Sequence, residues 1–373
     1  MKEINEIIGN TINERRQSLA EQIVARQYEQ QPDLWEPYGV VGRKVSIRDA
    51  SYHLGYLAEA ILAADVSLFT GYVGWIKELF AGLHFPDGAM IKTLECTGHV
   101  LGQVLPKKMA VMVDEYIAAG LEQMNRPAPV TGSFISERDP LADLVRQYMN
   151  TLLQGDRNEA IGLIADAVEK GIDVKDIFLW VFQPSQYEIG RLWQQNKISV
   201  AREHYCSIVT QMIMSQLYPH IFNANRNGRR LVAACVEGEL HQIGIHMVAN
   251  FFEMEGWDTY CLGANTPAKA IVQAIEDQEA DILGVSLTMN FHRSTLEDLV
   301  NRVRRSEIGK KIKILVGGYA FQKVPDLWKR LEVDGWAADA REAVKEANRL
   351  LNTKNGQTLS KGRERFSATN FFS

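Results

Sequence analysis

The chain has 373 residues, of which 46% are hydrophobic and 23% charged, a composition typical of a globular protein with two or three domains. Its formal net charge of −5 excludes a general nucleic-acid-binding protein, which would carry a basic surface. There is no apolar run long enough to cross a membrane and no signal peptide at the start, and the four cysteines are widely spaced, so we expect a cytoplasmic protein without a nucleic-acid or membrane partner.

Residues 1–126 are predicted to form an all-helical domain. Apolar residues recur at helical spacing from Glu6 to Gln30, and Ser46–Asp49 is typical of a capping box that opens a helix at Ala50. The segment is neither short nor basic, which excludes a small DNA-reading helix-turn-helix. It is then either a partner or dimerisation domain or a pocket for a second ligand, and we take His53 as the candidate residue of such a pocket.

A proline-bearing linker, residues 127–136, leads to a second helical block at residues 137–226. Four amphipathic segments with short joints predict an up-down four-helix bundle. They cover residues 140–154, 157–170, 174–195 and 200–221. Within the block, Trp193 is followed after nine residues by Glu203 and His204. Taken alone, Trp193 would be a core residue and the following pair a helix-surface pair.

The third block, residues 227–352, alternates strand and helix five times. The strands are expected near residues 230–236, 257–262, 280–287, 311–317 and 335–338. This pattern predicts a five-stranded parallel sheet of the flavodoxin-like, Rossmann-like kind. The tail, residues 353–373, is polar and is expected to be disordered.

The loop after the first predicted strand carries the main candidate site. His241 lies at the carboxyl end of that strand, where open α/β sheets bind their ligands. Glu239, two positions earlier, can accept one ring N–H, which fixes the tautomer and leaves the other nitrogen for a metal. Taken alone, such a loop more often holds a solvated histidine.

Two further strand ends change this interpretation. The third strand ends in Ser286-Leu287-Thr288 and the fourth in Gly317-Gly318-Tyr319, and with Glu239–Gly244 they resemble the cobalamin-binding domain family. The pattern of that family is Asp-x-His-x-x-Gly, Ser-x-Leu and Gly-Gly, here with Glu239 in place of the usual Asp, as in the cobalamin-dependent photoreceptors.

The resemblance implies that His241 replaces dimethylbenzimidazole as the lower cobalt ligand. The displaced nucleotide tail would enter a slot beside the serine and the glycines, where a Cβ would block its approach. The cofactor-binding residues expected from it are Glu239, Leu240, Gln242, Ile243, Gly244, Ser286, Leu287, Thr288, Gly317, Gly318 and Tyr319.

The helical block resembles the cap of the cobalamin-dependent photoreceptors. That resemblance implies that Trp193 packs on the adenosyl group of adenosylcobalamin, with Glu203 and His204 completing the pocket. In the light-sensing repressors of the family, a histidine follows the tryptophan and captures cobalt after illumination. In this chain, that position is occupied by Gln194. Either another histidine serves, or the light state differs, or light is not the input.

Three functions that share this cofactor are compared. The first, a light sensor, is favoured by the Trp-Glu-His cap and by Glu239. A corrinoid methyl carrier of a methyltransferase system is the alternative, although a carrier must expose the upper face that this cap would close. A mutase subunit would need a substrate barrel. No catalytic base, nucleophile or phosphate loop is evident, so we do not expect an enzyme.

The amino-terminal stretches 52–60 and 69–75 resemble the photocobilins, light sensors without a DNA-binding domain that hold a bilin beside the cobalamin. The resemblance implies biliverdin as a second chromophore, with His53 at the mouth of its pocket. Cys96 could form a thioether, although noncovalent binding is expected. The expected protein partner is a second copy of the chain or a downstream signalling protein.

Overall fold

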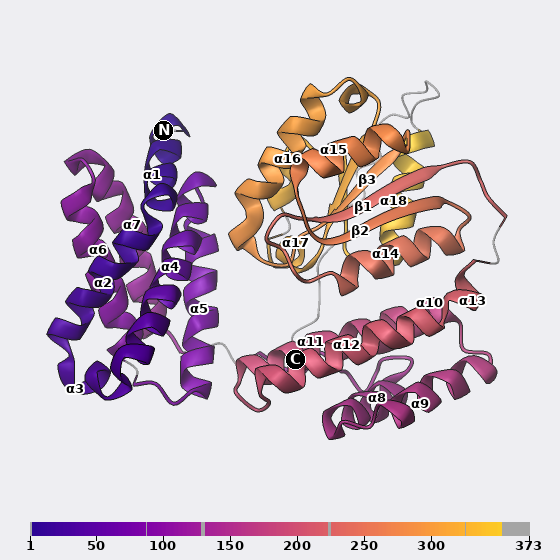
Figure 1. Cartoon of the computed structure of the whole chain (residues 1–373), viewed down its shortest axis with the longest axis horizontal. Coiled ribbons are helices and arrows are strands. Elements are labelled where there is room, and N and C mark those ends of the chain that lie inside the picture. Colours follow the sequence, from indigo (N-terminus) through magenta and orange to yellow (C-terminus); the bar gives the residue numbers. More distant parts are fainter. Residues whose placement is uncertain (1, 87, 128–130, 223–224, 325, 353–373) are drawn as a thin grey trace.

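The computed structural model describes residues 2–86, 88–127, 131–222, 225–324 and 326–352. Along the chain, amino-terminal helices are followed by a second helical block and then by a parallel sheet (Figure 1). The predicted disordered tail, residues 353–373, lies outside the described residues. Among the helices of the described part, none is both long and apolar enough to cross a membrane.

The amino-terminal helices pack around their own core, which includes the fully buried Leu54, Leu57 and Phe69. In chain order they are α1 (Lys2–Glu14), α2 (Arg16–Gln30), α3 (Pro32–Trp35), η1 (Glu36–Tyr38), α4 (Gly39–Leu62), α5 (Val66–Gly82), α6 (Gly88–Val104) and α7 (Lys107–Asn125). The expected helix start at Ser46–Asp49 is wrong. Instead, the chain turns at Gly39, which has a φ of +59°, and α4 runs on without a break through Ser46–Asp49.

The second block is a helical bundle, as expected. It contains α8 (Ala142–Gln154), α9 (Arg157–Glu169), α10 (Val174–Ile177), η2 (Phe178–Phe182), α11 (Gln183–Gln194), α12 (Val200–Gln216) and α13 (Tyr218–Ile221). The helix predicted over residues 174–195 is interrupted by a π-helical turn at η2. The turn comes just before Pro184, which cannot donate a backbone hydrogen bond to the preceding turn, so the helix widens there.

The carboxy-terminal part is a five-stranded sheet in which all strands are parallel, in the order β2-β1-β3-β4-β5. The strands are β1 (Arg230–Val236), β2 (Asp258–Thr266), β3 (Ile282–Ser286), β4 (Lys313–Gly317) and β5 (Gly335–Ala337). The helices between and after them are α14 (Ile243–Met254), α15 (Ala268–Asp277), η3 (Asn290–His292), α16 (Arg293–Arg305), η4 (Ile308–Lys310), α17 (Tyr319–Lys323), η5 (Leu327–Arg330) and α18 (Ala340–Asn352).

This is the flavodoxin-like winding expected from the sequence. The strand order reverses between β1 and β3, and a crevice opens at the carboxyl ends of the strands at such a switch point. His241 follows β1 and Thr288 follows β3, so both lie at this point.

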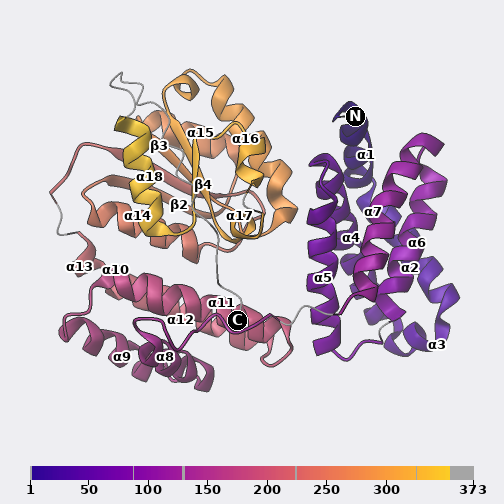
Figure 2. The same ribbon diagram turned by 180° about the vertical axis from the view of Figure 1, so that it is seen from behind.

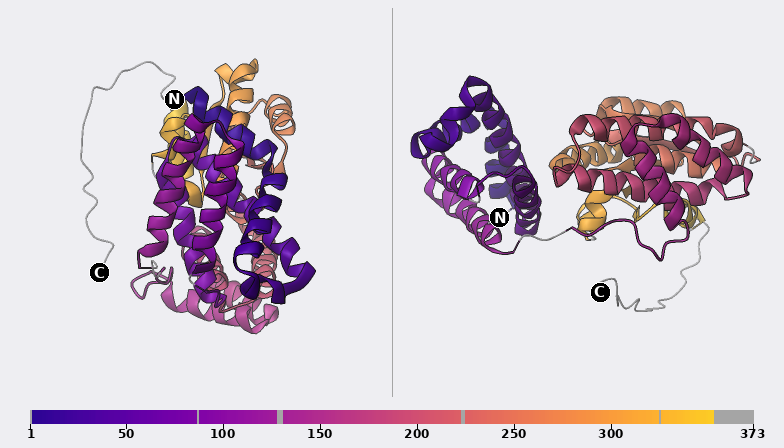
Figure 3. Two further views of the ribbon diagram at one scale, coloured as in Figure 1. Left: turned by 90° about the vertical axis from the view of Figure 1, so that its left-hand side faces the viewer. Right: turned by 90° about the horizontal axis from the view of Figure 1, so that it is seen from below.

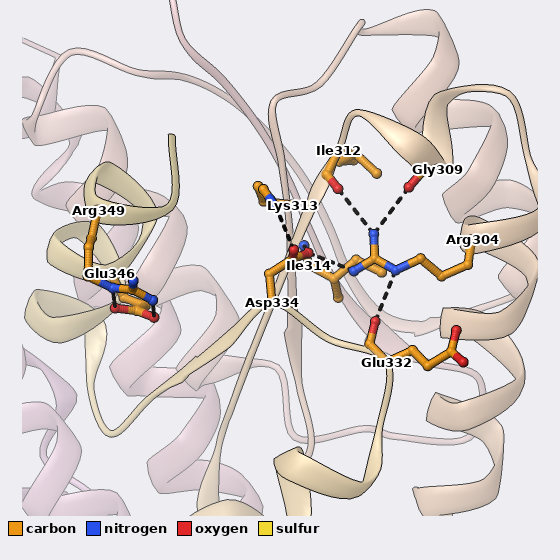
Figure 4. Close-up of polar contacts among 9 residues, drawn as sticks. All are labelled: Arg304, Gly309, Ile312, Lys313, Ile314, Glu332, Asp334, Glu346 and Arg349. Atoms are coloured by element: carbon orange, nitrogen blue, oxygen red, sulfur yellow. Dashed lines mark hydrogen bonds and ion pairs between the residues drawn. The ribbon is translucent and has the colours of Figure 1, made fainter. Parts of the chain in front are cut away.

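At the opposite, amino end of the sheet, Asp334 ties β4 and β5 to α16 (Figure 4). Its carboxylate accepts hydrogen bonds from Arg304 at 2.6 Å, Lys313 at 2.8 Å and the backbone N–H of Ile314 at 2.8 Å. Although burial alone would raise the pKa of Asp334, these donors lower it. The network stabilises the sheet far from the strand ends that form the site.

The three parts contact one another directly. The bundle lies along α14 and α18, where Phe178 packs on Phe251 with 6.2 Å between ring centroids and Arg341 pairs with Asp176 at 2.7 Å. From behind, α18 and α14 are both seen on the side of the sheet that faces the bundle (Figure 2). The amino-terminal helices form a separate body beside the other two parts (Figure 3).

Candidate functional site

The loop between β1 and α14 builds the pair expected from the sequence. His241 donates its Nδ1–H to Oε1 of Glu239 at 2.5 Å, and the same oxygen accepts the backbone N–H of His241 at 3.1 Å. The other carboxylate oxygen of Glu239 accepts the backbone N–H groups of Thr288 at 2.9 Å and Met289 at 3.0 Å. Glu239 is fully buried, and all of its bonds hold the ring of His241 in one orientation.

The electrostatics of the pair agree with this geometry. Burial alone would raise the pKa of Glu239, but the hydrogen bonds from His241 and from the backbone lower it to about 2. The hydrogen bond to Glu239 raises the pKa of His241 in turn. Because Nδ1 is engaged, Nε2 is the nitrogen of the 58% exposed ring that can serve a metal.

The residues expected to line a slot for an extended ligand lie close together at the strand ends. Ser286 and Gly317 are register partners at the ends of β3 and β4, and the Ser286 hydroxyl forms no hydrogen bond with any described residue. A Cβ on Gly244 would lie 3.8 Å from that hydroxyl, and one on Gly317 would lie 3.1 Å from the Ala337 carbonyl. Gly318 has a φ of +100° and approaches the Leu287 carbonyl too closely for any side chain. These residues fit the nucleotide tail of a cobalamin.

The remaining residues of the lower side have different surroundings. Leu240 is 69% exposed, Ile243 is partly buried and Leu287 is fully buried. Gln242 donates to Gln211 of α12 at 3.0 Å. Tyr319 contacts the bundle, with 5.4 Å between its ring centroid and that of Tyr187.

Helix α12 of the bundle lies next to this loop. Glu203 is near enough to contribute to the raised pKa of His241. Its carboxylate accepts a hydrogen bond from the Ser207 hydroxyl at 3.0 Å and also contacts Nδ1 of His204. Ile208, on the same helix, is 65% exposed. Ile208 and Leu240 are therefore two exposed apolar side chains, one on α12 and one on the His241 loop.

Trp193 and Gln194 turn toward the amino-terminal helices. The ring of Trp193 lies 6.2 Å from that of Trp75 in α5. Gln194 donates to the Trp75 carbonyl and to Glu78, both at 3.2 Å. The structure therefore brings Glu203 near the His241 loop, with His204 in contact with Glu203, whereas Trp193 lies at the junction between the bundle and α5.

One histidine near the pair was missed by the sequence reasoning. His292 packs against Gly238, where an added Cβ would lie 2.8 Å from a ring carbon. Burial lowers the pKa of His292, and Glu239 and His241 both act on it electrostatically. Its position directly after the Ser286–Thr288 stretch was the available signal, since that strand end was already expected to face the site.

The expectation for His53 needs correction. It does not lie at the mouth of a cleft: it is buried, its Nδ1 is 2.6 Å from the hydroxyl of Tyr72, and burial lowers its pKa to about 4. Cys96 is buried as well, which raises the pKa of its thiol and disfavours a thioether bond.

A pocket of about 560 Å³ does open elsewhere on the amino-terminal helices, between α2, α4 and the loop after β3. It combines positive charge with aromatic rings. Its lining includes Arg16, Lys44, Arg48, Tyr52 and Phe291.

Comparisons with known proteins agree with this organisation. Residues 229–345 match a family model described as a B12 binding domain, and residues 144–218 match a second model with that description. The amino-terminal residues 7–124 match the phycobilisome protein family.

Two relatives illustrate the likeness. A corrinoid protein of Desulfitobacterium hafniense is 23% identical over 216 residues, which are 57% of this chain and 99% of the relative. Dimethylamine corrinoid protein 3 of Methanosarcina acetivorans is 27% identical over 122 residues, and the match covers 32% of this chain and 56% of that relative. Both relatives are named corrinoid proteins.

The monomethylamine corrinoid protein of Methanosarcina barkeri shares the fold, with a TM-score of 0.51 at 17% identity. The likeness covers 56% of this chain and 99% of that one. The bundle and the sheet thus each match a B12 binding domain model, and a corrinoid relative aligns over nearly its whole length, so this half of the chain is similar to cobalamin-binding proteins.

Proposed function

We propose that the chain is a light sensor that holds adenosylcobalamin between the bundle and the sheet and a bilin on its amino-terminal helices. The observation that carries the proposal is the match of residues 7–124 to the phycobilisome protein family in one chain with two B12 binding matches. Bound cobalamin would supply visible absorption and a cobalt–carbon bond that light can break.

The residues of the chain have separate parts in this proposal. His241 offers Nε2 from below, and Glu239 keeps its ring oriented. Ser286 and the glycines of the slot leave room for the nucleotide tail. Glu203 and His204 of α12 would border the upper side, and Trp193 would act from its contact with Trp75 of α5.

The bilin would occupy the pocket between α2, α4 and the loop after β3. Its two propionate groups would pair with the cations of Arg16, Lys44 and Arg48, and its conjugated rings would lie against Tyr52 and Phe291. We expect noncovalent binding, since Cys96 is buried and does not line this pocket. A second copy of the chain or a cytoplasmic signalling protein would receive the output.

A corrinoid methyl carrier is the second candidate, and the names of the relatives favour it over the light sensor. Those relatives are corrinoid proteins, one of them of dimethylamine metabolism by its name. A carrier has to present the upper face of its corrinoid to a methyltransferase. Against this candidate, the Trp193 end of the bundle is covered by α5 of the amino-terminal helices.

Absorption spectra of the purified full chain distinguish the two candidates. For the sensor we expect tight binding of adenosylcobalamin, bleaching under green light with a change of assembly state, and a red-absorbing complex with biliverdin that weakens in the variant Arg16→Ala/Arg48→Ala. For the carrier we expect a preference for methylcobalamin, transfer of its methyl group to an added thiol, and no response to biliverdin.

A further inference from the structure

The loop after β3, which is residues 287–294 and includes the first two residues of α16, is bonded near both ends to buried carboxylates from distant parts of the chain. At its start, the backbone N–H groups of Thr288 and Met289 donate to Glu239. At its end, Ser294 donates its backbone N–H at 3.0 Å and its hydroxyl at 2.5 Å to Glu59 of α4, 235 positions earlier in the sequence. The loop therefore joins the His241 pair to the amino-terminal helices.

The middle of the loop is held by the same helix. The ring of Phe291 lies 5.8 Å from that of Tyr52 and 5.5 Å from that of Tyr56, and the hydroxyl of Tyr56 contacts the sulfur of Met289 at 3.9 Å. Gly55 permits this approach, because a Cβ there would lie 2.2 Å from a ring carbon of Phe291. Helix α4 thus contacts the loop through a carboxylate, two phenols and a glycine.

We infer that α4 positions the proposed lower cobalt ligand, with Glu59 as the positioning residue: it holds the loop whose two backbone N–H groups orient Glu239, and Glu239 orients the ring of His241. Glu59 itself contacts neither His241 nor the slot. Its effect would pass through the four residues between Met289 and Ser294, which form the turn η3 and the start of α16.

The electrostatic surroundings support this linkage. Burial mainly raises the pKa of the Tyr56 hydroxyl, and the carboxylate of Glu239 adds to it, so this side chain of α4 lies near Glu239. Arg293, buried next to Glu59, keeps its Nε 3.8 Å from that carboxylate and donates from Nη1 to Glu297 at 3.1 Å. A ligand that shifts α4 would therefore also shift the loop, because Glu59 and Tyr56 of α4 both contact it.

The test compares Glu59→Ala with Arg330→Ala in the full chain. Arg330 pairs with Asp65 at 2.7 Å across the same two parts but does not touch the loop, so it is the matched control. In the protein without cofactor, we expect faster hydrogen exchange of the Thr288 and Met289 amides in Glu59→Ala only. With cobalamin, we expect about 10-fold weaker binding and a smaller histidine-ligated fraction in the spectrum, as for other outer partners of a metal ligand.

Two further variants make the result decisive. Glu59→Gln keeps an acceptor for Ser294 and should restore most of the affinity, whereas Gly55→Ala, a good helix former, should reproduce the loss by displacing Phe291. Unchanged exchange and affinity in both Glu59→Ala and Gly55→Ala would overturn the inference. It rests on His241 as the lower ligand, and a His241→Ala variant tested in parallel separates the two: if only His241→Ala changes the spectrum, the ligand stands and the positioning role fails.

Discussion

The His241 loop and the junction with the amino-terminal helices are specified in different ways. In the loop, Glu239 and His241 meet because they are two residues apart at the end of a strand. At the junction, Glu59 meets Ser294 and Trp75 meets Trp193 only because separately folded parts pack together. The first region can be identified from a short motif, whereas the second requires the three-dimensional arrangement.

Among substitutions in the two regions, we expect the largest effect on cobalamin binding at His241. His241→Ala should weaken cobalamin binding about 100-fold or more and abolish the histidine-ligated spectrum, because the loop then offers no ring nitrogen to cobalt. Since the side chain is 58% exposed, the fold of the cofactor-free protein should be unaffected, and circular dichroism is the control. Wild-type affinity with an unchanged spectrum would contradict the assignment.

Glu239→Gln should have the next effect, about 10-fold or more on affinity. An amide can still accept one hydrogen bond, but its NH₂ group would face the backbone N–H groups of Thr288 and Met289, which are also donors. Titration with cobalamin measures the loss. Equal affinity in Glu239→Gln and the wild type would contradict this prediction, because it would mean that cobalamin binding does not depend on the orientation of the His241 ring.

Asp334, at the amino end of the sheet, lies far from both regions, so the pH dependence of its contribution to stability serves as a reference. The folded pKa of Asp334 is lowered, so its ionised form stabilises the protein above its ordinary pKa near 4, and this stabilisation is lost as the pH falls through the folded pKa. Asp334→Asn should therefore cost about 1–2 kcal/mol in the free energy of unfolding at pH 7 and progressively less below pH 4. Chemical unfolding at a series of pH values measures both; a difference that stays constant down to pH 2 would contradict this reading.

The smallest effect is expected at the bundle junction. Gln194→Ala removes hydrogen bonds to the Trp75 carbonyl and to Glu78, for an expected loss of about 1 kcal/mol in stability, with cobalamin affinity nearly unchanged. Thermal unfolding and cobalamin titration check the two parts of the prediction. A large loss of affinity would show that the junction, and not only the His241 loop, determines cofactor binding.

Much of the fold could be predicted because local patterns decide it. Buried apolar runs alternating with amphipathic helices specify the parallel sheet, and the spacing within Glu239–Gly244 places an oriented histidine at a strand end. Ser286, Gly317 and Gly318 follow from the same logic, because strand ends in register must lie side by side. These features depend on residues that are near in sequence or paired by the sheet.

The contacts between the amino-terminal helices, the bundle and the sheet were decided only by the tertiary structure. The capping pattern at Ser46–Asp49 was overridden because the chain had already turned at Gly39, and His53 proved to be a buried partner of Tyr72. The close approach of Phe291 to Gly55, and the bonds of Glu59 to Ser294, join segments more than 230 positions apart. No local propensity encodes such a contact, since it depends on which faces of two finished cores are complementary.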